Sequence, residues 1–265
     1  MGLINYYKMI SSSWETMIQV QNLTKSFKSV TALKGVNFTA KDGEVTGLIG
    51  PNGAGKTTAL RILSTVMSPD SGTATIDGFD TVKDRYEVQR RIGVLPDTLG
   101  LYPRLTAREH IRYFGRLHKM DKSILESRIE ELVEALGMES FIDRRARGFS
   151  KGQTRKLTLA RALVHKPQNL MLDEPTNGLD IATSRSVHRL ISNLRDEGRT
   201  ILFCSHIMQE VGSISDRIII IANGSVTADG TAQELFELSG CDDFEEMFLK
   251  LSNDYESDRG ADNVA

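Results

Sequence analysis

Residues 50–57 place the strongest constraint on the fold of this chain. They read Gly-Pro-Asn-Gly-Ala-Gly-Lys-Thr, which matches every fixed position of the phosphate-cradling pattern G-x-x-x-x-G-K-[ST]. The short apolar run Val45–Ile49 before them predicts a buried parallel strand, and Lys56–Met67 after them has the apolar spacing of a helix. A strand, a glycine loop and a helix in this order predict an α/β domain that binds a nucleotide.

The predicted cradle comprises Gly50, Pro51, Asn52, Gly53, Ala54, Gly55, Lys56, Thr57 and Thr58. Glycines let the backbone approach the phosphates, and the positive end of the following helix favours an anion. We expect the Lys56 ammonium to reach the β and γ phosphates. We expect the Thr57 hydroxyl to bind the Mg²⁺ ion that bridges these phosphates.

Length and composition limit the alternatives. A chain of 265 residues is long enough for one α/β domain with an inserted lobe. Its two cysteines, Cys204 and Cys241, lie far apart without metal-ligand spacing, so both are expected to be free thiols. The formal net charge of −2 argues against a protein that holds nucleic acid by charge alone.

The chain shows no segment expected to cross a membrane. Its longest apolar runs, such as Ile218–Ala222, are far shorter than the roughly twenty residues that span a bilayer. Residues 1–16 lack the apolar stretch of a signal peptide, so we interpret them as an N-terminal extension. The first expected strand begins at Met17, and we hypothesise that Met17 is the first residue of the native protein.

The region beside the glycine loop predicts a small antiparallel sheet. Its strands are expected at Met17–Val20, Leu33–Thr39 and Thr73–Ile76, with a turn at Asp77-Gly78. Residues 100–160 then have helical periodicity. Thr106 and Glu109 have the spacing of a capping box, so an inserted helical lobe is expected here.

Strand-like runs return at Leu170–Leu172, Thr200–Cys204 and Arg217–Ala222, separated by helices such as Ile181–Arg195. Their continuous hydrophobicity predicts a mainly parallel sheet with helices on both faces. We therefore predict a nucleotide-binding domain over residues 17–240. Residues 241–265 are expected to form a tail that is disordered beyond Asn253.

Two carboxylates follow the strand Leu170–Leu172, at the sheet edge where ligands of open α/β sheets bind. Asp173 is expected to assist Mg²⁺ through its water shell. Glu174 is expected to orient and polarise the water that attacks the γ phosphate.

The segment Phe149–Gln153 before these acids and Asn177–Asp180 after them make the pattern specific. With the glycine loop, they resemble the nucleotide-binding subunit of ABC transporters over residues 17–230, which implies a P-loop NTPase core. The resemblance implies that two copies form a head-to-tail dimer. In such a dimer Ser150, Gly152 and Gln153 of one copy cap the ATP that the other copy holds.

The same resemblance implies three further roles. Phe27 is placed to stack on adenine, Asp180 links one site to the other across the dimer, and His206 holds the hydrolysis geometry near the γ phosphate. The catalytic set predicted in this way is Lys56, Glu174 and His206.

Two positions depart from the family pattern. Asp97 stands where the family has a glutamine, and Lys151 stands where many members have glycine. A carboxylate can meet Mg²⁺ or water, so the predicted metal ligands are Thr57, Asp173 and Asp97.

The resemblance also implies a partner. A separate integral-membrane permease is expected, with the ATPase bound peripherally at the cytoplasmic face of the inner (plasma) membrane and with Leu101–Leu105 as its docking loop. Segments such as Gly93–Asp97 resemble the ATP-binding subunits of bacterial sodium-extrusion exporters, although exporters of drugs, lipids or polysaccharides stay open. The alternative function is a non-transport ABC ATPase that acts on ribosomes or DNA; its usual second cassette and long coiled coil are absent from this sequence.

Overall fold

The computed structural model describes residues 17–97 and 100–261, with side chains as far as Ser252. One sheet is antiparallel, with the order β2-β1-β4-β5. Its strands are β1 (Met17–Phe27), β2 (Val30–Lys41), β4 (Ser71–Ile76) and β5 (Phe79–Asp80). The strands are longer than predicted, and the Asp77-Gly78 turn joins β4 to β5 with positive φ at both residues. The N-terminal extension, residues 1–16, lies outside the described range, and Met17, the hypothetical start, is the first residue of β1.

The second sheet has the order β10-β9-β3-β8-β7-β6. Five strands are parallel and β10 is antiparallel to β9. The bounds are β3 (Val45–Ile49), β6 (Ile92–Leu95), β7 (Asn169–Asp173), β8 (Thr200–Ser205), β9 (Arg217–Ala222) and β10 (Ser225–Gly230). The predicted α/β class, with a mainly parallel sheet and a smaller antiparallel sheet, is confirmed.

The parallel strands are buried on both faces because two apolar cores lie on opposite sides of the sheet. Along β8, Ile201 and Phe203 point into one core, whereas Leu202 and Cys204 point into the other. Alternate residues of a strand face opposite sides, so an uninterrupted apolar run fills both cores. This arrangement holds the carboxyl ends of β3, β7 and β8 at one fixed edge.

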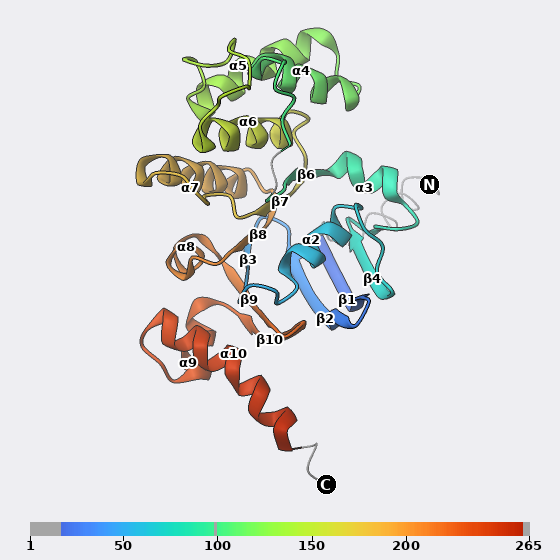
Figure 1. Ribbon diagram of the computed structural model, residues 1–265, viewed down its shortest axis with the longest axis vertical. Coiled ribbons are helices and arrows are strands. Elements are labelled where there is room, and N and C mark those ends of the chain that lie inside the picture. Colours follow the sequence, from blue (N-terminus) through green and yellow to red (C-terminus); the bar gives the residue numbers. More distant parts are fainter. Residues whose placement is uncertain (1–16, 98–99, 262–265) are drawn as a thin grey trace, which may run out of the picture.

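Helices complete the two layers and the lobe (Figure 1). The glycine loop leads into α2 (Lys56–Leu63), and the lobe at the top of the figure contains α4 (Ala107–Leu117), α5 (Lys122–Leu136) and α6 (Lys151–Leu163). The remaining helices are α3 (Arg85–Arg91), α7 (Ile181–Asp196), α8 (Met208–Ile214), α9 (Ala232–Ser239) and α10 (Phe244–Ala261). Both halves of the predicted capping box between Thr106 and Glu109 are present.

Two expectations need correction. The helix predicted to reach Met67 ends at Leu63, because Thr65 has φ 62° and the chain turns there. The tail predicted to be disordered beyond Asn253 is helical as far as Ala261. Met247, Phe248 and Leu251 are buried in the main core, and a helix nucleated by such packing extends at little cost. Residues 262–265 lie outside the described range.

Among residues 17–97 and 100–261, no helix combines the length and the apolarity that a membrane crossing needs.

Candidate functional site

The glycine loop connects β3 to α2. Gly55 is the N-cap residue of α2, with φ 111°, a conformation that side chains other than that of glycine rarely adopt. A Cβ atom at Gly55 would lie 2.5 Å from the Ala32 carbonyl oxygen. The glycine therefore allows the loop to pass close to β2 and to turn into the helix.

Lys56 folds back over this loop. Its ammonium donates hydrogen bonds to the carbonyl oxygens of Gly50 at 2.6 Å and Pro51 at 3.1 Å. The side chain is 8% exposed, so its charge is held in place by these carbonyls. A phosphate in the loop would offer the ammonium stronger, charge-assisted partners.

A cavity of about 350 Å³ opens at this end of the parallel sheet. It is lined by Asn52, Gly53, Ala54, Gly55, Lys56, Thr57, Thr58, Asp97, Asp173, Glu174, Asn177 and His206. The structure thus brings together most of the predicted cradle, both predicted acids and the predicted histidine. Asn177 was missed as a lining residue, although it lies in a segment that the sequence marks.

Asp173 ends β7 and lies beside the start of α2. Burial raises the pKa of its carboxyl group, the neighbouring Thr57 hydroxyl lowers this pKa, and nearby Asp97 and Glu174 raise it further. A hydroxyl and carboxylate oxygens are suitable ligands for Mg²⁺. No group of three or more His, Cys, Asp or Glu side chains that could hold a metal occurs in the part of the chain that the structure describes. An ion at Thr57 and Asp173 would need phosphate oxygens or water molecules to complete its coordination.

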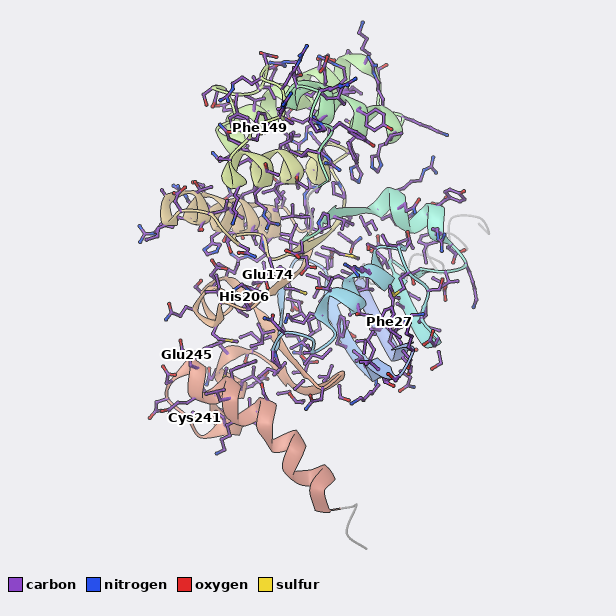
Figure 2. All side chains as sticks on the ribbon, viewed as in Figure 1. Phe27, Phe149, Glu174, His206, Cys241 and Glu245 are labelled. Atoms are coloured by element: carbon purple, nitrogen blue, oxygen red, sulfur yellow. The ribbon has the colours of Figure 1, made fainter. Side chains whose placement is uncertain are left out.

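Glu174 and His206 face each other across the ends of β7 and β8 (Figure 2). The His206 Nδ1 lies 2.7 Å from a carboxylate oxygen of Glu174. Glu174 has φ 52°, and its amide donates to the Cys204 carbonyl oxygen at 2.9 Å. The strained backbone turns the carboxylate towards the cavity, where it can polarise a water molecule.

Asp97 follows β6 and is exposed. It lines the cavity at the glycine loop and also an adjoining cavity of about 310 Å³, whose lining includes Lys151 and Arg155. Its charge raises the pKa of Asp173. Asp97 therefore lies between the cavity at the glycine loop and the cavity beside Lys151 and Arg155.

Arg155 was missed by the sequence analysis. It is 5% exposed and donates a hydrogen bond to the Asp173 carbonyl oxygen at 3.4 Å. Burial lowers the pKa of its guanidinium group, whereas Asp97, Glu174 and Asp173 oppose that shift. The guanidinium offsets part of the negative charge that these three acids gather, and no local sequence signal marks this role.

The segment around Ser150 does not line the cavity at the glycine loop of its own chain. Ser150 caps α6 by accepting a hydrogen bond from the Gln153 amide, and the Gln153 side chain accepts one from the Ser150 amide. Gly152 lies in the first turn of α6, with open space beyond Leu179 and Ser150. Figure 2 places neighbouring Phe149 on the lobe, away from Glu174 and His206.

Phe27 and Asp180 also lie outside that cavity. Phe27 ends β1, is 43% exposed, and has the Lys25 ammonium 5.9 Å from its ring centre. Asp180 is exposed and caps α7 by accepting a hydrogen bond from the Thr183 amide. Their roles towards adenine and towards a second site stay predictions.

Comparisons with known proteins agree on one family. The family model described as ABC transporter matches residues 33–177. The ABC transporter ATP-binding protein NatA of Bacillus subtilis (strain 168) is 43% identical over 238 residues, covering 88% of this chain and 97% of that protein. The Nod factor export ATP-binding protein I of Paraburkholderia xenovorans (strain LB400) is 38% identical over 230 residues, covering 86% of this chain and 75% of that protein.

A solved structure gives the same result. The ATP-binding cassette MJ0796, described as a dimeric post-hydrolysis state bound to ADP and Pi, matches with a TM-score of 0.75 and 28% identity. The match covers 81% of this chain and 98% of the cassette.

Proposed function

The chain belongs to the ABC transporter family as an ATP-hydrolysing, ATP-binding subunit, and from this premise we propose that two copies drive a membrane exporter. One observation carries the proposal. Lys56 from the glycine loop, Asp173 and Glu174 from the end of β7, and His206 from the end of β8 meet at one cavity. This set has a cation for phosphates, a carboxylate for a metal ion, and a base held by a histidine.

The residues divide the work of hydrolysis. The loop amides and Lys56 would bind the phosphates, and Thr57 with Asp173 would hold Mg²⁺, which neutralises charge on the phosphate oxygens. Glu174 would orient the attacking water and accept its proton at a carboxylate oxygen. His206, now bound to that carboxylate at 2.7 Å, would keep it directed at the γ phosphate.

The head-to-tail dimer is supported by surfaces that a single chain leaves exposed. Asp180 is exposed and the next residue, Ile181, is 76% exposed, so this segment is open to contact by a second copy. Ser150, Gly152 and Gln153 lie outside the cavity of their own chain and would reach the ATP of the second copy. The MJ0796 cassette, similar to this chain, is described as dimeric.

The export partner is a separate permease, with this subunit bound at the cytoplasmic face of the membrane. The loop predicted to dock it has an apolar surface, because Tyr102 is 54% exposed and packs edge-to-face with Tyr113 at 6.0 Å. We propose the sodium ion as cargo on the sequence resemblance. The similar proteins include one named for Nod factor export, so the permease rather than this chain would select the cargo.

The test is co-purification of a tagged Glu174→Gln variant from detergent-solubilised native membranes with Mg-ATP. The amide should retain ATP binding but cannot act as the base, so an ATP-loaded dimer should accumulate with its partner. Lys56→Ala is the matched control, because it should lose ATP and hence the trapped dimer.

Recovery of a multi-spanning protein with Glu174→Gln, and less of it with Lys56→Ala, is the expected result. Sodium efflux from vesicles that contain the pair would then test the cargo. Recovery of only ribosomes, DNA or soluble partners would overturn the transport proposal and favour the alternative function.

A further inference from the structure

The carboxylate of Glu210 lies behind the proposed catalytic pair, on α8. Its side chain is 14% exposed, and one of its oxygens accepts a hydrogen bond of 2.5 Å from the Thr176 hydroxyl. The same oxygen lies 3.4 Å from the Ser205 hydroxyl. Thr176 and Ser205 are both buried. Glu210 thus joins the turn after β7 to the end of β8.

The two hydroxyl residues that Glu210 contacts lie close in the chain to Glu174 and His206. Thr176 is in the turn that begins with Glu174, and Ser205 directly precedes His206. The last backbone hydrogen bond between the two strand ends runs from the Glu174 amide to the Cys204 carbonyl oxygen. Beyond it the two segments are joined by side chains, through the contact of His206 with Glu174 and through the contacts of Glu210 with Thr176 and Ser205.

The turn itself is closed by local hydrogen bonds. The Asn177 amide donates to the Glu174 carbonyl oxygen at 3.1 Å, and the Leu179 amide donates to the Thr176 carbonyl oxygen at 3.0 Å. The Ser205 hydroxyl accepts from the Ile207 amide at 3.0 Å. Each loop is therefore internally ordered, and Glu210 connects two ordered units.

The reacting side chains have little else to fix their separation. His206 is 51% exposed, and its contact with Glu174 is a hydrogen bond between a ring nitrogen and a carboxylate. Its ring is therefore not held by dense packing. The relative position of the two loops decides whether that contact forms.

We propose that Glu210 is a positioning residue that sets the separation of Glu174 and His206 by holding Thr176 and Ser205 together. This inference rests on the proposed function of that pair. His188, whose Nε2 lies 3.7 Å from the other carboxylate oxygen, places the same side chain against α7. The side chain of Glu210 has hydrogen-bond or ion-pair contacts with Thr176, Ser205 and His188. These three residues are not assigned to nucleotide or metal binding, so the loss of Glu210 should lower turnover more than ATP binding.

The first test compares steady-state ATP hydrolysis by the wild-type chain and three variants. Glu210→Ala removes both acceptor oxygens, Glu210→Gln keeps one acceptor, and Gln209→Ala is the matched control at an exposed position of the same helix. A charge-assisted hydrogen bond contributes enough that its loss should lower kcat about 10- to 100-fold. KM for ATP should change less than about threefold in Glu210→Ala. Glu210→Gln should recover kcat to within about fivefold, and Gln209→Ala should match the wild type.

A second variant addresses folding. Thr176→Val keeps the shape of the side chain but removes its hydroxyl, so it should lower kcat in the same direction. Combined with Glu210→Ala, it should add little, because both changes break one contact. A wild-type kcat in Glu210→Ala, equal losses of kcat and ATP affinity, or additive losses in the double variant would each overturn the proposal.

Hydrogen exchange of the nucleotide-free protein separates this proposal from the proposed function. The amides of Asn177 and Leu179 should exchange faster in Glu210→Ala than in Gln209→Ala, because the turn loses its anchor. Unchanged exchange would refute the role of Glu210 even if the wild-type chain hydrolyses ATP. Faster exchange in Glu210→Ala, together with a wild-type chain that hydrolyses no ATP, would instead retain the contact and refute the proposed function.

Discussion

Two glycines of the loop differ in one respect that can be tested. Gly53 and Gly55 both have positive φ, at 83° and 111°. An added Cβ at Gly53 would meet nothing within 4 Å, whereas one at Gly55 would lie 2.5 Å from the Ala32 carbonyl oxygen and 2.7 Å from a methyl group of Leu33. Gly53→Ala therefore changes backbone preference alone, and Gly55→Ala adds a steric clash with β2.

The expected costs differ accordingly. A left-handed backbone costs a residue other than glycine about 1–2 kcal/mol, which is the whole effect predicted for Gly53→Ala. An overpacked site adds about 1–3 kcal/mol, so Gly55→Ala should lose about 2–5 kcal/mol of unfolding free energy. The clash involves backbone atoms of β2, so it cannot be relieved by moving the end of a flexible side chain.

The assay is urea unfolding of the nucleotide-free variants, followed by titration with ATP. Gly55→Ala should be the less stable variant, and its loop should move away from β2, which should weaken ATP binding about tenfold or more. Equal loss of unfolding free energy in the two variants would refute the reasoning, because the Ala32 contact would then carry no cost.

Further predictions concern charged groups at the site and His165, a histidine that follows α6. Lys56→Ala should lower ATP affinity about a hundredfold or more by isothermal titration, because charge-assisted hydrogen bonds to phosphate are lost; an affinity within threefold of the wild type, about 0.7 kcal/mol, would contradict the cradle. Asp97→Gln should leave ATP affinity nearly intact at saturating Mg²⁺, so a large loss would place Asp97 in contact with the nucleotide. Burial, with neighbouring His118, lowers the pKa of His165 from its ordinary value of 6.5 to about 4. The unfolded chain therefore binds a proton that the folded chain excludes in this range, and stability falls as the pH drops from about 6.5 towards about 4. Between pH 7.5 and pH 5, His165 should lower the free energy of unfolding by about 2 kcal/mol. In urea unfolding, the free energy of His165→Gln should therefore fall by about 2 kcal/mol less over this range than that of the wild type.

Local chemical signals account for the parts of the fold that the sequence predicts well. Asp77-Gly78 and Asn223-Gly224 adopt positive φ at both residues, as tight hairpin turns require. Gly137 ends α5 in the left-handed conformation. In each case the deciding residues are neighbours in the chain, so a short segment contains the whole reason for the structure.

Errors arise where packing between distant segments decides. The apolar spacing through Met67 favours a longer α2, but Met67 packs against the core beside the antiparallel sheet after the chain has turned at Thr65. Similarly, the polar composition after Asn253 says nothing of Met247 and Phe248, which are buried and anchor α10. Composition and periodicity describe one segment by itself, so they do not predict how that segment packs against distant parts of the chain.

The site shows the same division. The sequence predicts Glu174 from the end of an apolar strand, and the family resemblance implies the role of His206, but the 2.7 Å between them depends on contacts that no motif contains. β7 and β8 must be neighbours, the Glu174 amide must reach Cys204, and Thr176 must reach Glu210 at 2.5 Å. A catalytic base must lie within hydrogen-bond reach of the group it serves. A substitution at Thr176 or Glu210 can therefore separate Glu174 from His206 without changing the glycine loop or the two acids after the strand. The motifs alone would still predict an active ATPase for such a variant.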